Sequence, residues 1–390
     1  MKQTALAIKD KLVELRKWDK SYKKLRRHLH KMPVGYPGTF SGVERRLLKA
    51  MFTVDEAELA VFMDYRFESA AAIHTKARHT GITEERVAEL LAAMEERGAI
   101  FHREINGVSH YALVPFVIGM YEMQLARLTP GYYLDTREYV AKKYGIEYLT
   151  TAVPQMRVIP VEKSVTPEHN IATYDEVRDI IEKTEKRIGV AECICRKAKD
   201  TVGEPCRVTD RREICLGFRD FHDMYDRHGW GRDITKEEAF ELLDQAEKEG
   251  LVLQPSNEQE PQFICACCNC CCGVLEMMRI MPRAADFAAS NFYAVLDTGA
   301  CNGCGKCVKR CQMEALTLVD KKAVLNVEKC IGCGLCVSGC KTGAIQLVKK
   351  EKETVPPVTT EDLYETIMKN KKTWVGKYLT AARAALGKPV

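Results

Sequence analysis

The chain of 390 residues has no cysteine before Cys193 and none after Cys340. It also lacks a long hydrophobic run, since the longest apolar stretch, around residues 111–121, is far shorter than the roughly 20 residues that span a bilayer. The first 20 residues are charged and have no apolar centre of the kind that a signal peptide needs. These absences predict a cytoplasmic protein without a transmembrane segment.

Motifs for nucleotide and hydrolytic chemistry are also missing. The sequence has no phosphate loop, no zinc-protease helix and no glycine-rich dinucleotide fingerprint. The segment Gly229-Trp230-Gly231 comes closest to the fingerprint, but no strand precedes it and the third glycine is absent. Hydride and phosphoryl transfer are therefore unsupported.

What the sequence does have is 18 cysteines, all between residues 193 and 340. In a long chain without secretory features, clustered cysteines indicate metal binding or redox chemistry, not a disulfide scaffold. Exposed redox-active metal–thiolate centres are sensitive to oxygen, so an anaerobic host is expected.

Eight of these cysteines form an internal repeat. The run Cys301-Asn-Gly-Cys304-Gly-Lys-Cys307-Val-Lys-Arg-Cys311 recurs 29 residues later as Cys330-Ile-Gly-Cys333-Gly-Leu-Cys336-Val-Ser-Gly-Cys340. The match extends past the cysteines, pairing Ala315 with Ala344 and Leu318 with Leu347. Each unit predicts a cysteine loop, a short helical turn and a strand, and two units build a pseudo-twofold domain.

This repeat resembles the bacterial dicluster ferredoxins, in which the fourth cysteine of each run ligates the other cluster. The resemblance implies two [4Fe–4S] clusters with crossed ligands: Cys301, Cys304, Cys307 and Cys340 for one, and Cys330, Cys333, Cys336 and Cys311 for the other. The family's proline after each fourth cysteine is replaced by Gln312 and Lys341. Zinc sites usually use two cysteine pairs, so three close cysteines plus a remote one argue against zinc.

Ten further cysteines are candidate metal ligands in a middle domain. One group, sufficient for a tetrathiolate site, is Cys193, Cys195, Cys206 and Cys215; a denser group is Cys265, Cys267, Cys268, Cys270, Cys271 and Cys272. Core packing does not explain six cysteines in eight residues. Three interpretations stay open: one or two additional Fe–S clusters, zinc or another metal, and a thiol redox or substrate site. Arg196 could stabilise cluster charge, and His222 and His228 could be ligands or proton donors.

The predicted fold class is α+β and multidomain. The expected parts are a basic amphipathic helical arm (1–35), a winged-helix-like domain (36–130), a connecting α/β segment (131–190), a mixed cysteine-rich domain (191–292), a ferredoxin-like 2[4Fe–4S] domain (293–350) and an amphipathic helical C-terminal tail (351–390). The winged-helix resemblance comes from helices predicted at 54–63, 69–77 and 83–97, followed by a hairpin turning at Asn106-Gly107. A further helix is expected at 117–128.

Charge argues against DNA binding by this domain. The helix at 83–97, which would enter the major groove, has five acidic residues against Arg86 and Arg97. Residues 1–50 have 14 basic residues against four acidic ones, but a solvated helix face explains them as well as a nucleic-acid contact does.

Together these features predict a multi-cluster iron–sulfur electron-transfer protein, or the electron-transfer subunit of a reductase, with the middle domain as a further cluster or terminal redox site. Two alternatives remain: an Fe–S redox-sensing transcriptional regulator, and a reductase with its active site in the middle domain. The expected partners are a redox protein, a larger reductase complex or a second copy of the chain; nucleic acid is not expected.

Overall fold

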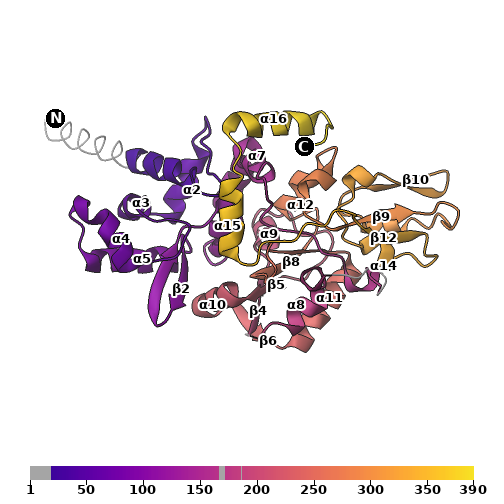
Figure 1. Cartoon of the computed structure of the whole chain (residues 1–390), viewed down its shortest axis with the longest axis horizontal. Helices are drawn as coiled ribbons and strands as arrows, with labels where there is room; N and C mark the ends of the chain where they lie inside the picture. The colour runs from indigo at the N-terminus through magenta and orange to yellow at the C-terminus, as the bar shows by residue number, and fades with distance from the viewer. Residues whose placement is uncertain (1–18, 167–171, 186) are drawn as a thin grey trace. The chain divides into compact units, whose positions relative to one another are not determined.

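The computed structural model describes residues 19–166, 172–185 and 187–390. The chain divides into two compact units, residues 1–148 and 149–390 (Figure 1). Residues 19–29 are helical, whereas residues 1–18 of the predicted arm lie outside the described residues. Within those residues, no helix has both the length and the apolar character needed to cross a membrane.

Unit 1 contains the predicted hairpin and the three helices predicted before it. The order is α2 (Val43–Met51), α3 (Val54–Ala60), β1 (Glu68–Ser69), α4 (Ala70–Ala77), α5 (Glu84–Glu96), β2 (Phe101–Ile105) and β3 (Val108–Ala112). The strands form one antiparallel sheet in the order β1-β3-β2. Thr83 caps α5 by accepting a hydrogen bond from the Arg86 N–H. Asn106 and Gly107 both have positive φ angles, as the two-residue turn requires.

The prediction of a helix at 117–128 is wrong. Val117 and Ile118 are extended inside the short segment Phe116–Met120, and Gly119 has a φ of 156°. Only a 3₁₀ turn, Glu122–Gln124, follows before α6 (Pro130–Tyr139). The apolar residues there serve packing instead, since the Phe116 ring lies 5.5 Å from Tyr139 and 5.3 Å from Tyr144 between ring centroids.

The middle of unit 2 is an antiparallel sheet of five strands. Its order is β6 (Gly231–Ile234), β4 (Ile188–Glu192), β5 (Glu213–Phe218), β8 (Phe263–Cys267) and β7 (Val252–Pro255). Helix α10 (Arg219–His228) packs on β4, β5 and β6, and α8 (Val177–Glu182) contacts α11 (Lys236–Glu249). Two short helices, α9 (Ile194–Thr201) and α12 (Gly273–Arg279), begin directly after Cys193 and Cys272.

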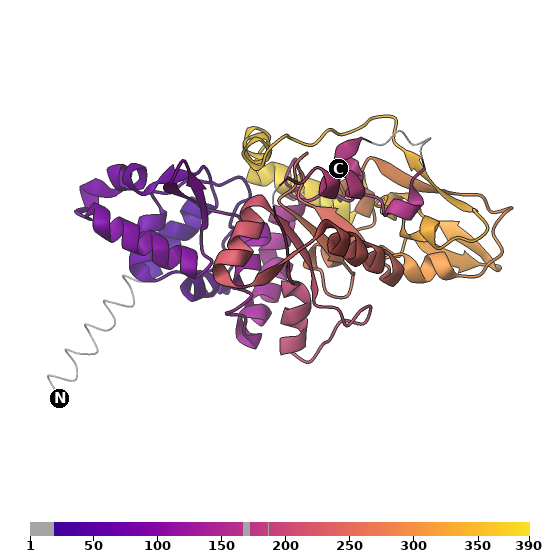
Figure 2. The same cartoon turned by 90° about the horizontal axis from the view of Figure 1, so that it is seen from below.

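The cysteine repeat folds as two equivalent units at one end of unit 2 (Figures 1 and 2). The first loop leads to α13 (Lys306–Arg310) and β10 (Leu316–Val319), and the second leads to α14 (Leu335–Ser338) and β12 (Ile345–Lys349). Strand β12 pairs with β9 (Phe292–Leu296), and β10 pairs with β11 (Lys322–Leu325), both antiparallel. The predicted order of loop, turn and strand is confirmed in both copies.

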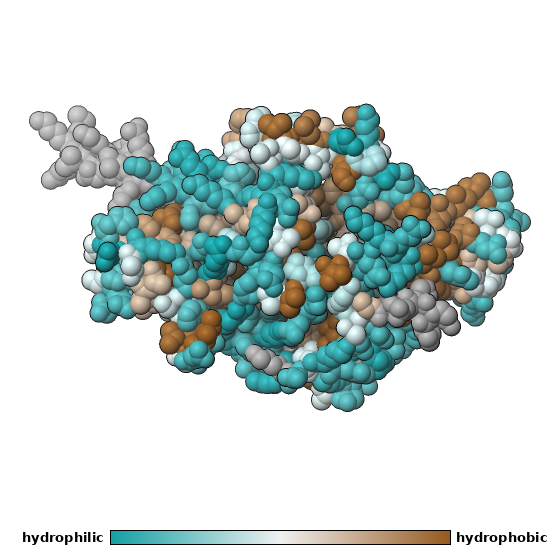
Figure 3. Space-filling view, viewed as in Figure 1, coloured by the Kyte–Doolittle hydropathy of each residue, from teal (hydrophilic) through white to brown (hydrophobic). Residues whose placement is uncertain are grey.

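The C-terminal tail consists of α15 (Thr360–Lys369) and α16 (Trp374–Ala385). Helix α15 buries Leu363 and Ile367. The segment before it is tied to the middle domain, because the Gln259 N–H donates to the Pro357 carbonyl at 2.8 Å. Helix α16 leaves Trp374 and Tyr378 exposed, and apolar side chains are visible along it in Figure 3.

Candidate metal centres

Glycines shape the two cysteine loops of the ferredoxin-like part. Gly303 and Gly305 in the first loop have φ angles of 74° and 70°, and their counterparts Gly332 and Gly334 have 72° and 75°. Residues with a side chain rarely adopt this conformation, so the repeated Cys-x-Gly-Cys-Gly pattern fixes one loop shape twice. At Gly303 a Cβ atom would also collide with the backbone carbonyl of Lys321.

We expect Gly303→Ala to destabilise the first loop by more than the roughly 1–2 kcal/mol that a left-handed alanine costs. Gly343→Ala is the matched control, because Gly343 has a φ of 68° but open space around its Cα. Chemical denaturation and iron retention of the two variants would measure the difference. Equal effects would show that the backbone contact at Lys321 does not matter.

Backbone N–H groups point at the thiols of the repeat. Cys301 Sγ accepts from the N–H of Ala323 and of Gly303, both at 3.4 Å, and these two donors lower the pKa of the Cys301 thiol. Cys330 Sγ accepts from Ala294 at 3.3 Å, and Cys311 Sγ accepts from Ala315 at 3.2 Å. Such donors stabilise thiolate charge, as the cysteine ligands of an iron–sulfur cluster require.

One cavity of unit 2 shows which thiols gather. Its lining includes Cys311 of the first run together with Cys330, Cys333 and Cys336 of the second, set among apolar side chains. Burial, with the nearby charges of Cys311 and Cys330, raises the pKa of the Cys333 thiol to about 12. Buried thiols of this kind ionise when a metal ion displaces the proton, so the donor set fits a bound metal cluster.

The thiols expected for the other cluster, Cys301, Cys304, Cys307 and Cys340, include an exposed one. Cys340 adds a repulsive charge at Cys301, and Cys301 and Cys304 do the same at Cys307. Cys304 is exposed. The fourth cysteine of the second run thus lies near Cys301 of the first run, while Cys311 lies near the first three of the second.

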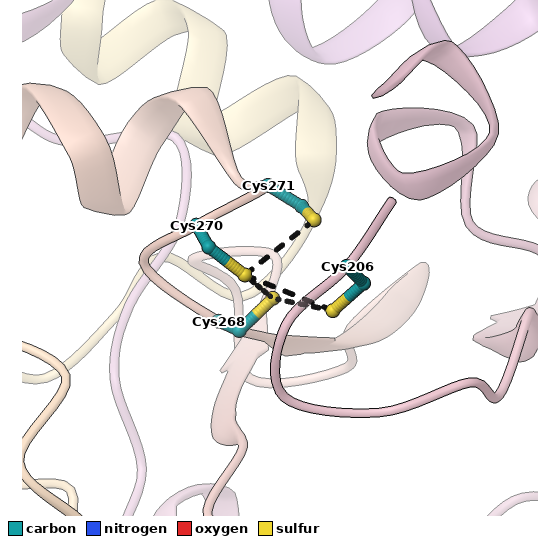
Figure 4. A group of neighbouring side chains, drawn as sticks. All are labelled: Cys206, Cys268, Cys270 and Cys271. Carbon is teal, nitrogen blue, oxygen red and sulfur yellow. Dashed lines mark hydrogen bonds between the residues drawn. The ribbon is translucent and has the colours of Figure 1, made fainter. Parts of the chain in front are cut away.

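A tighter group of thiols occurs in the middle domain, and we call it the Cys206 site. The Sγ atoms of Cys206, Cys268, Cys270 and Cys271 all lie within 4.8 Å of one another (Figure 4). Cys206 is 3.6 Å from Cys268 and 3.7 Å from Cys270, and Cys270 is 3.5 Å from Cys268 and 3.7 Å from Cys271. Cys206 comes from the loop after α9, and the other three come from the loop between β8 and α12.

The spacing at the Cys206 site matches one tetrahedral ion. Four thiolates bound at about 2.3 Å around a single ion lie about 3.8 Å apart. Contacts with Cys206, Cys268 and Cys270 raise the pKa of the Cys271 thiol far above its ordinary value. Four negative sulfurs at this distance repel one another, so a bound cation is what allows all of them to ionise. In the described part of the chain, no three ferredoxin thiols approach so closely.

Arg196 lies against this site inside the protein. Its side chain is 1% exposed, and its Nη2 donates to the Ala266 carbonyl at 3.0 Å and lies 3.9 Å from Cys268 Sγ. Within the described residues it forms no ion pair with a carboxylate, and its Nε and Nη1 have no hydrogen-bond partner. A buried cation without a carboxylate needs another anion. Metal-bound thiolates would supply one, which agrees with the role expected for Arg196.

The structure does not arrange the ten middle-domain cysteines in the two groups that the sequence predicted. Cys206 joins the later group, and Cys215 Sγ lies 3.7 Å from Cys265 Sγ, not beside Cys206. Cys193 contacts Cys195 and lies near Cys267. The physical reason is the sheet, because the pairing of β5 with β8 brings residue 215 opposite residue 265.

The two histidines have other contacts. His222 is buried on α10, and its Nε2 lies 2.7 Å from Asp233 Oδ1, with Nδ1 at 3.2 Å from Asp223 Oδ1. His228 stacks on Trp230 with 4.3 Å between ring centroids. The His222 ring thus pairs with carboxylates and the His228 ring packs on Trp230, which explains their positions without a metal.

Gln312 links the ferredoxin-like part to the Cys206 site. Its Oε1 accepts from the Asn269 N–H at 2.9 Å, and its main-chain carbonyl accepts from Asn269 Nδ2 at 3.0 Å. Its Nε2 donates to the Gly250 carbonyl at 2.8 Å. Asn269 lies between Cys268 and Cys270, and Gln312 follows Cys311 directly, so these side chains join the two cysteine loops.

Sequence reasoning identified Gln312 only as the residue that replaces the family's proline, and it did not single out Asn269. Arg310 was also missed, although it adds to the junction by donating from Nη2 to the Glu247 carbonyl at 2.7 Å and from Nη1 to the Lys248 carbonyl at 3.1 Å. The proline replacement was the available signal, because glutamine has donors and an acceptor that proline lacks.

Residues 293–341 match the family described as the 4Fe-4S dicluster domain. Comparisons with curated proteins and with solved structures found no significant match. The matched segment includes both cysteine runs and ends one residue after Cys340, so it does not include the Cys206 site. The match supports a ferredoxin-type iron–sulfur domain at this end of unit 2.

Proposed function

We propose that this chain is a multi-cluster iron–sulfur electron-transfer protein, or the electron-transfer component of a reductase. In this proposal the ferredoxin-type domain holds two [4Fe–4S] clusters with crossed ligands: Cys301, Cys304, Cys307 and Cys340 for the first cluster, and Cys330, Cys333, Cys336 and Cys311 for the second. The Cys206 site holds an iron centre that exchanges electrons with the second cluster.

The observation that carries the proposal is the junction of Gln312 with Asn269. It connects a residue next to Cys311, a ligand of the second cluster, to a residue flanked by two ligands of the Cys206 site. The ion pair of Arg279 with Glu314, 2.6 Å between Nη1 and Oε1, adds a further link beside it. Electron transfer between fixed centres depends on a short separation, and this hydrogen-bonded contact between the loops of two thiolate sites supplies one.

Electrons would enter at the first cluster. Cys304 is exposed, while Cys333, its counterpart in the second run, is half-buried. Beside the first loop, Leu318, Val319 and Val324 are also exposed, although Leu347, the repeat counterpart of Leu318, is 3% exposed. Figure 3 shows an apolar area over β10. Such a patch next to an exposed centre suits brief docking of a redox partner protein.

Anaerobic metal analysis tests this proposal. After reconstitution with iron and sulfide, the protein should bind more than the roughly 8 Fe that two [4Fe–4S] clusters need. Cys268→Ala should lose the additional iron and its Mössbauer signal while the signals of both cubes remain. A sample that saturates at 8 Fe and has stoichiometric zinc at the Cys206 site would contradict an electron-accepting centre there.

A second candidate function, a redox-sensing regulator, has one observation in its favour. The elements α3, β1, α4, α5, β2 and β3 follow the order of a winged helix-turn-helix domain, with β2 and β3 as the wing. In such domains the helix in the position of α5 reads the major groove.

The charges of α5 oppose that role. Arg86 pairs with Asp55 at 3.2 Å and with Glu89 at 2.9 Å, and Arg97 pairs with Glu56. Both basic side chains of the helix are therefore already neutralised within the unit, while Glu84 and Glu85 stand at its first turn. Phosphates would meet net negative charge there.

We expect no sequence-specific DNA binding by the full chain. Fluorescence anisotropy with the promoter of its own gene should give only weak association, in the range of roughly 10⁻⁴–10⁻⁶ M that is usual for non-specific contacts. Changing Glu84 and Glu85 to alanine should leave this unchanged or strengthen it. Tight, salt-sensitive binding that these alanines abolish would favour the regulator.

A further inference from the structure

Helix α16 turns its large apolar side chains away from the protein. Trp374 is 78% exposed and Leu386, at the end of the helix, is 72% exposed. Between them Val375, Tyr378 and Leu379 are exposed as well. Residues three, four and one position apart lie along one side of a helix, so these five side chains share one face, which we call the α16 face. Figure 3 shows apolar side chains along this helix.

The opposite side of α16 fixes the helix to unit 2. Lys377 and Ala384 are buried there, although neither is a large apolar residue. After the helix the chain stays attached, because the Val390 N–H donates to Asp286 Oδ2 at 3.3 Å. The helix is therefore held by its small and polar side, and its exposed apolar face is a fixed feature of the surface.

The preceding helix, α15, has the ordinary orientation. Leu363 and Ile367 are buried, while Asp362 and Lys369 are exposed. The two helices follow each other in the chain, yet α15 buries its apolar side chains and α16 exposes them. Isolated apolar residues are common on protein surfaces, but a continuous apolar face indicates a binding surface.

The charge around the α16 face has one sign. Residues 366–390 contain no acidic residue and six basic ones: Lys369, Lys371, Lys372, Lys377, Arg383 and Lys388. Of these six, Lys377 is the buried one. The others lie before the helix, in its last turn or after it, so positive charge borders the apolar face at both ends. The partner that fits such a surface is apolar and carries negative charge.

The combination of residue types selects a lipid surface. Trp and Tyr side chains favour the boundary between headgroups and acyl chains, and basic residues near it are attracted to anionic headgroups. A helix of this kind lies in the plane of the interface with its apolar face inserted. The 12 residues of α16 reach about 18 Å, far less than the roughly 30 Å of a bilayer core.

We propose that the α16 face docks this protein on the surface of an anionic phospholipid membrane. Trp374, Tyr378 and Leu379 enter the interface, and the basic residues at both ends of the helix contact phosphate headgroups. This inference goes beyond the proposed electron-transfer function and does not depend on it.

Co-sedimentation of the full-length protein with phospholipid vesicles tests the docking. Vesicles of equal parts phosphatidylglycerol and phosphatidylcholine should bind the protein, and rising salt should weaken this binding. Trp374→Ser and Leu379→Ser should each lower the affinity at least about tenfold, since each removes a large side chain that would leave water. Phe40→Ser is the matched control, because Phe40 is a fully exposed aromatic residue of unit 1.

The basic residues have a separate test. Changing Lys369 and Lys388 together to glutamine should weaken binding to the anionic vesicles by roughly 10- to 30-fold. Vesicles of phosphatidylcholine alone should bind the wild-type protein and this variant equally weakly. Equal binding of the wild-type protein to both kinds of vesicle would contradict recognition of anionic lipid.

Fluorescence of Trp374 reports the contact without altering the α16 face. The chain has three tryptophans, so Trp18→Phe combined with Trp230→Phe leaves Trp374 as the fluorophore. Its emission should shift to shorter wavelength when anionic vesicles are added, and lipids with brominated acyl chains should quench it. Unchanged emission in the presence of these vesicles would overturn the proposal.

Two further results would also overturn it. Vesicle binding that Trp374→Ser and Leu379→Ser leave at the wild-type level would assign the binding to other basic residues, such as those in residues 1–50. An oligomer that Leu379→Ser dissociates in sedimentation velocity, without vesicle binding by the wild-type protein, would show that a second copy of the chain covers this face. The iron content should be unchanged in all these variants, so failure of the docking leaves the proposed function intact.

Discussion

Replacing Cys340 with alanine is expected to abolish the first proposed cluster, which we assign to Cys301, Cys304 and Cys307, although Cys340 belongs to the second cysteine run. The reason is spatial, because Cys340 lies near Cys301 while Cys311 lines a cavity with Cys330, Cys333 and Cys336. A [4Fe–4S] cube with three cysteine ligands loses iron easily, so the first-cluster signal should disappear or become that of a three-iron species.

Cys311→Ala is the reciprocal variant and should damage the second cluster instead. Electron paramagnetic resonance of the reduced proteins, with iron counts, separates the two outcomes. Because the second set is more buried, its signal should be the less sensitive of the two to oxygen. Damage to the second cluster by Cys340→Ala would show that each run closes its own cluster, and the crossed assignment would then be wrong.

The ferredoxin repeat was readable from sequence because its chemistry is local. Each loop needs cysteines at fixed spacing and two glycines, Gly303 and Gly305 in the first loop and Gly332 and Gly334 in the second. Within one loop all of these positions lie within a few residues of one another. The same holds for the hairpin at Asn106-Gly107 and for α5, whose cap and hydrophobic face are contiguous. Such elements are specified by short windows of sequence.

The grouping of the middle-domain cysteines was only partly predictable from the sequence, because cysteines that meet in the structure are remote in the chain. Cys206 meets Cys268 across 62 residues, and that meeting depends on how β5 pairs with β8. Periodicity does not predict which strands become neighbours. The helix expected at 117–128 failed for a related reason, since Gly119 and the packing of Phe116 among aromatic rings override the local apolar pattern.

Gln312 shows how a departure from a family pattern can carry information. Proline at this position would lack the side-chain oxygen that accepts from Asn269 and the amide that donates to Gly250. In an isolated ferredoxin these two protein partners would be absent, and water would take their place. Here they hold the loop of Cys311 against the loop of the Cys206 site, which gives the ferredoxin-type domain a fixed neighbour.

Gln312→Pro is therefore expected to slow electron transfer from the ferredoxin clusters to the Cys206 site strongly, without removing either cluster. It removes the two side-chain hydrogen bonds of Gln312 and weakens the third, from Asn269 to the residue 312 carbonyl, each worth about 1 kcal/mol. A total of about 2–3 kcal/mol lowers the ratio of docked to undocked loops by roughly 30- to 150-fold. Asn269→Ala should act in the same direction, because it removes the bond to that carbonyl from the other side.

Rapid-freeze paramagnetic resonance after mixing with a reductant would follow this transfer, with Cys304→Ala as a reference in which the entry cluster itself is lost. Gln346→Ala is the matched control, an exposed glutamine of β12 in the same domain, and it should transfer electrons at the wild-type rate. If Gln312→Pro and Cys304→Ala both left reduction of the Cys206 site at the wild-type rate, the ferredoxin clusters would not supply electrons to the Cys206 site. If only Cys304→Ala slowed it, electrons would still pass through the ferredoxin domain, but by a route other than the Gln312–Asn269 junction.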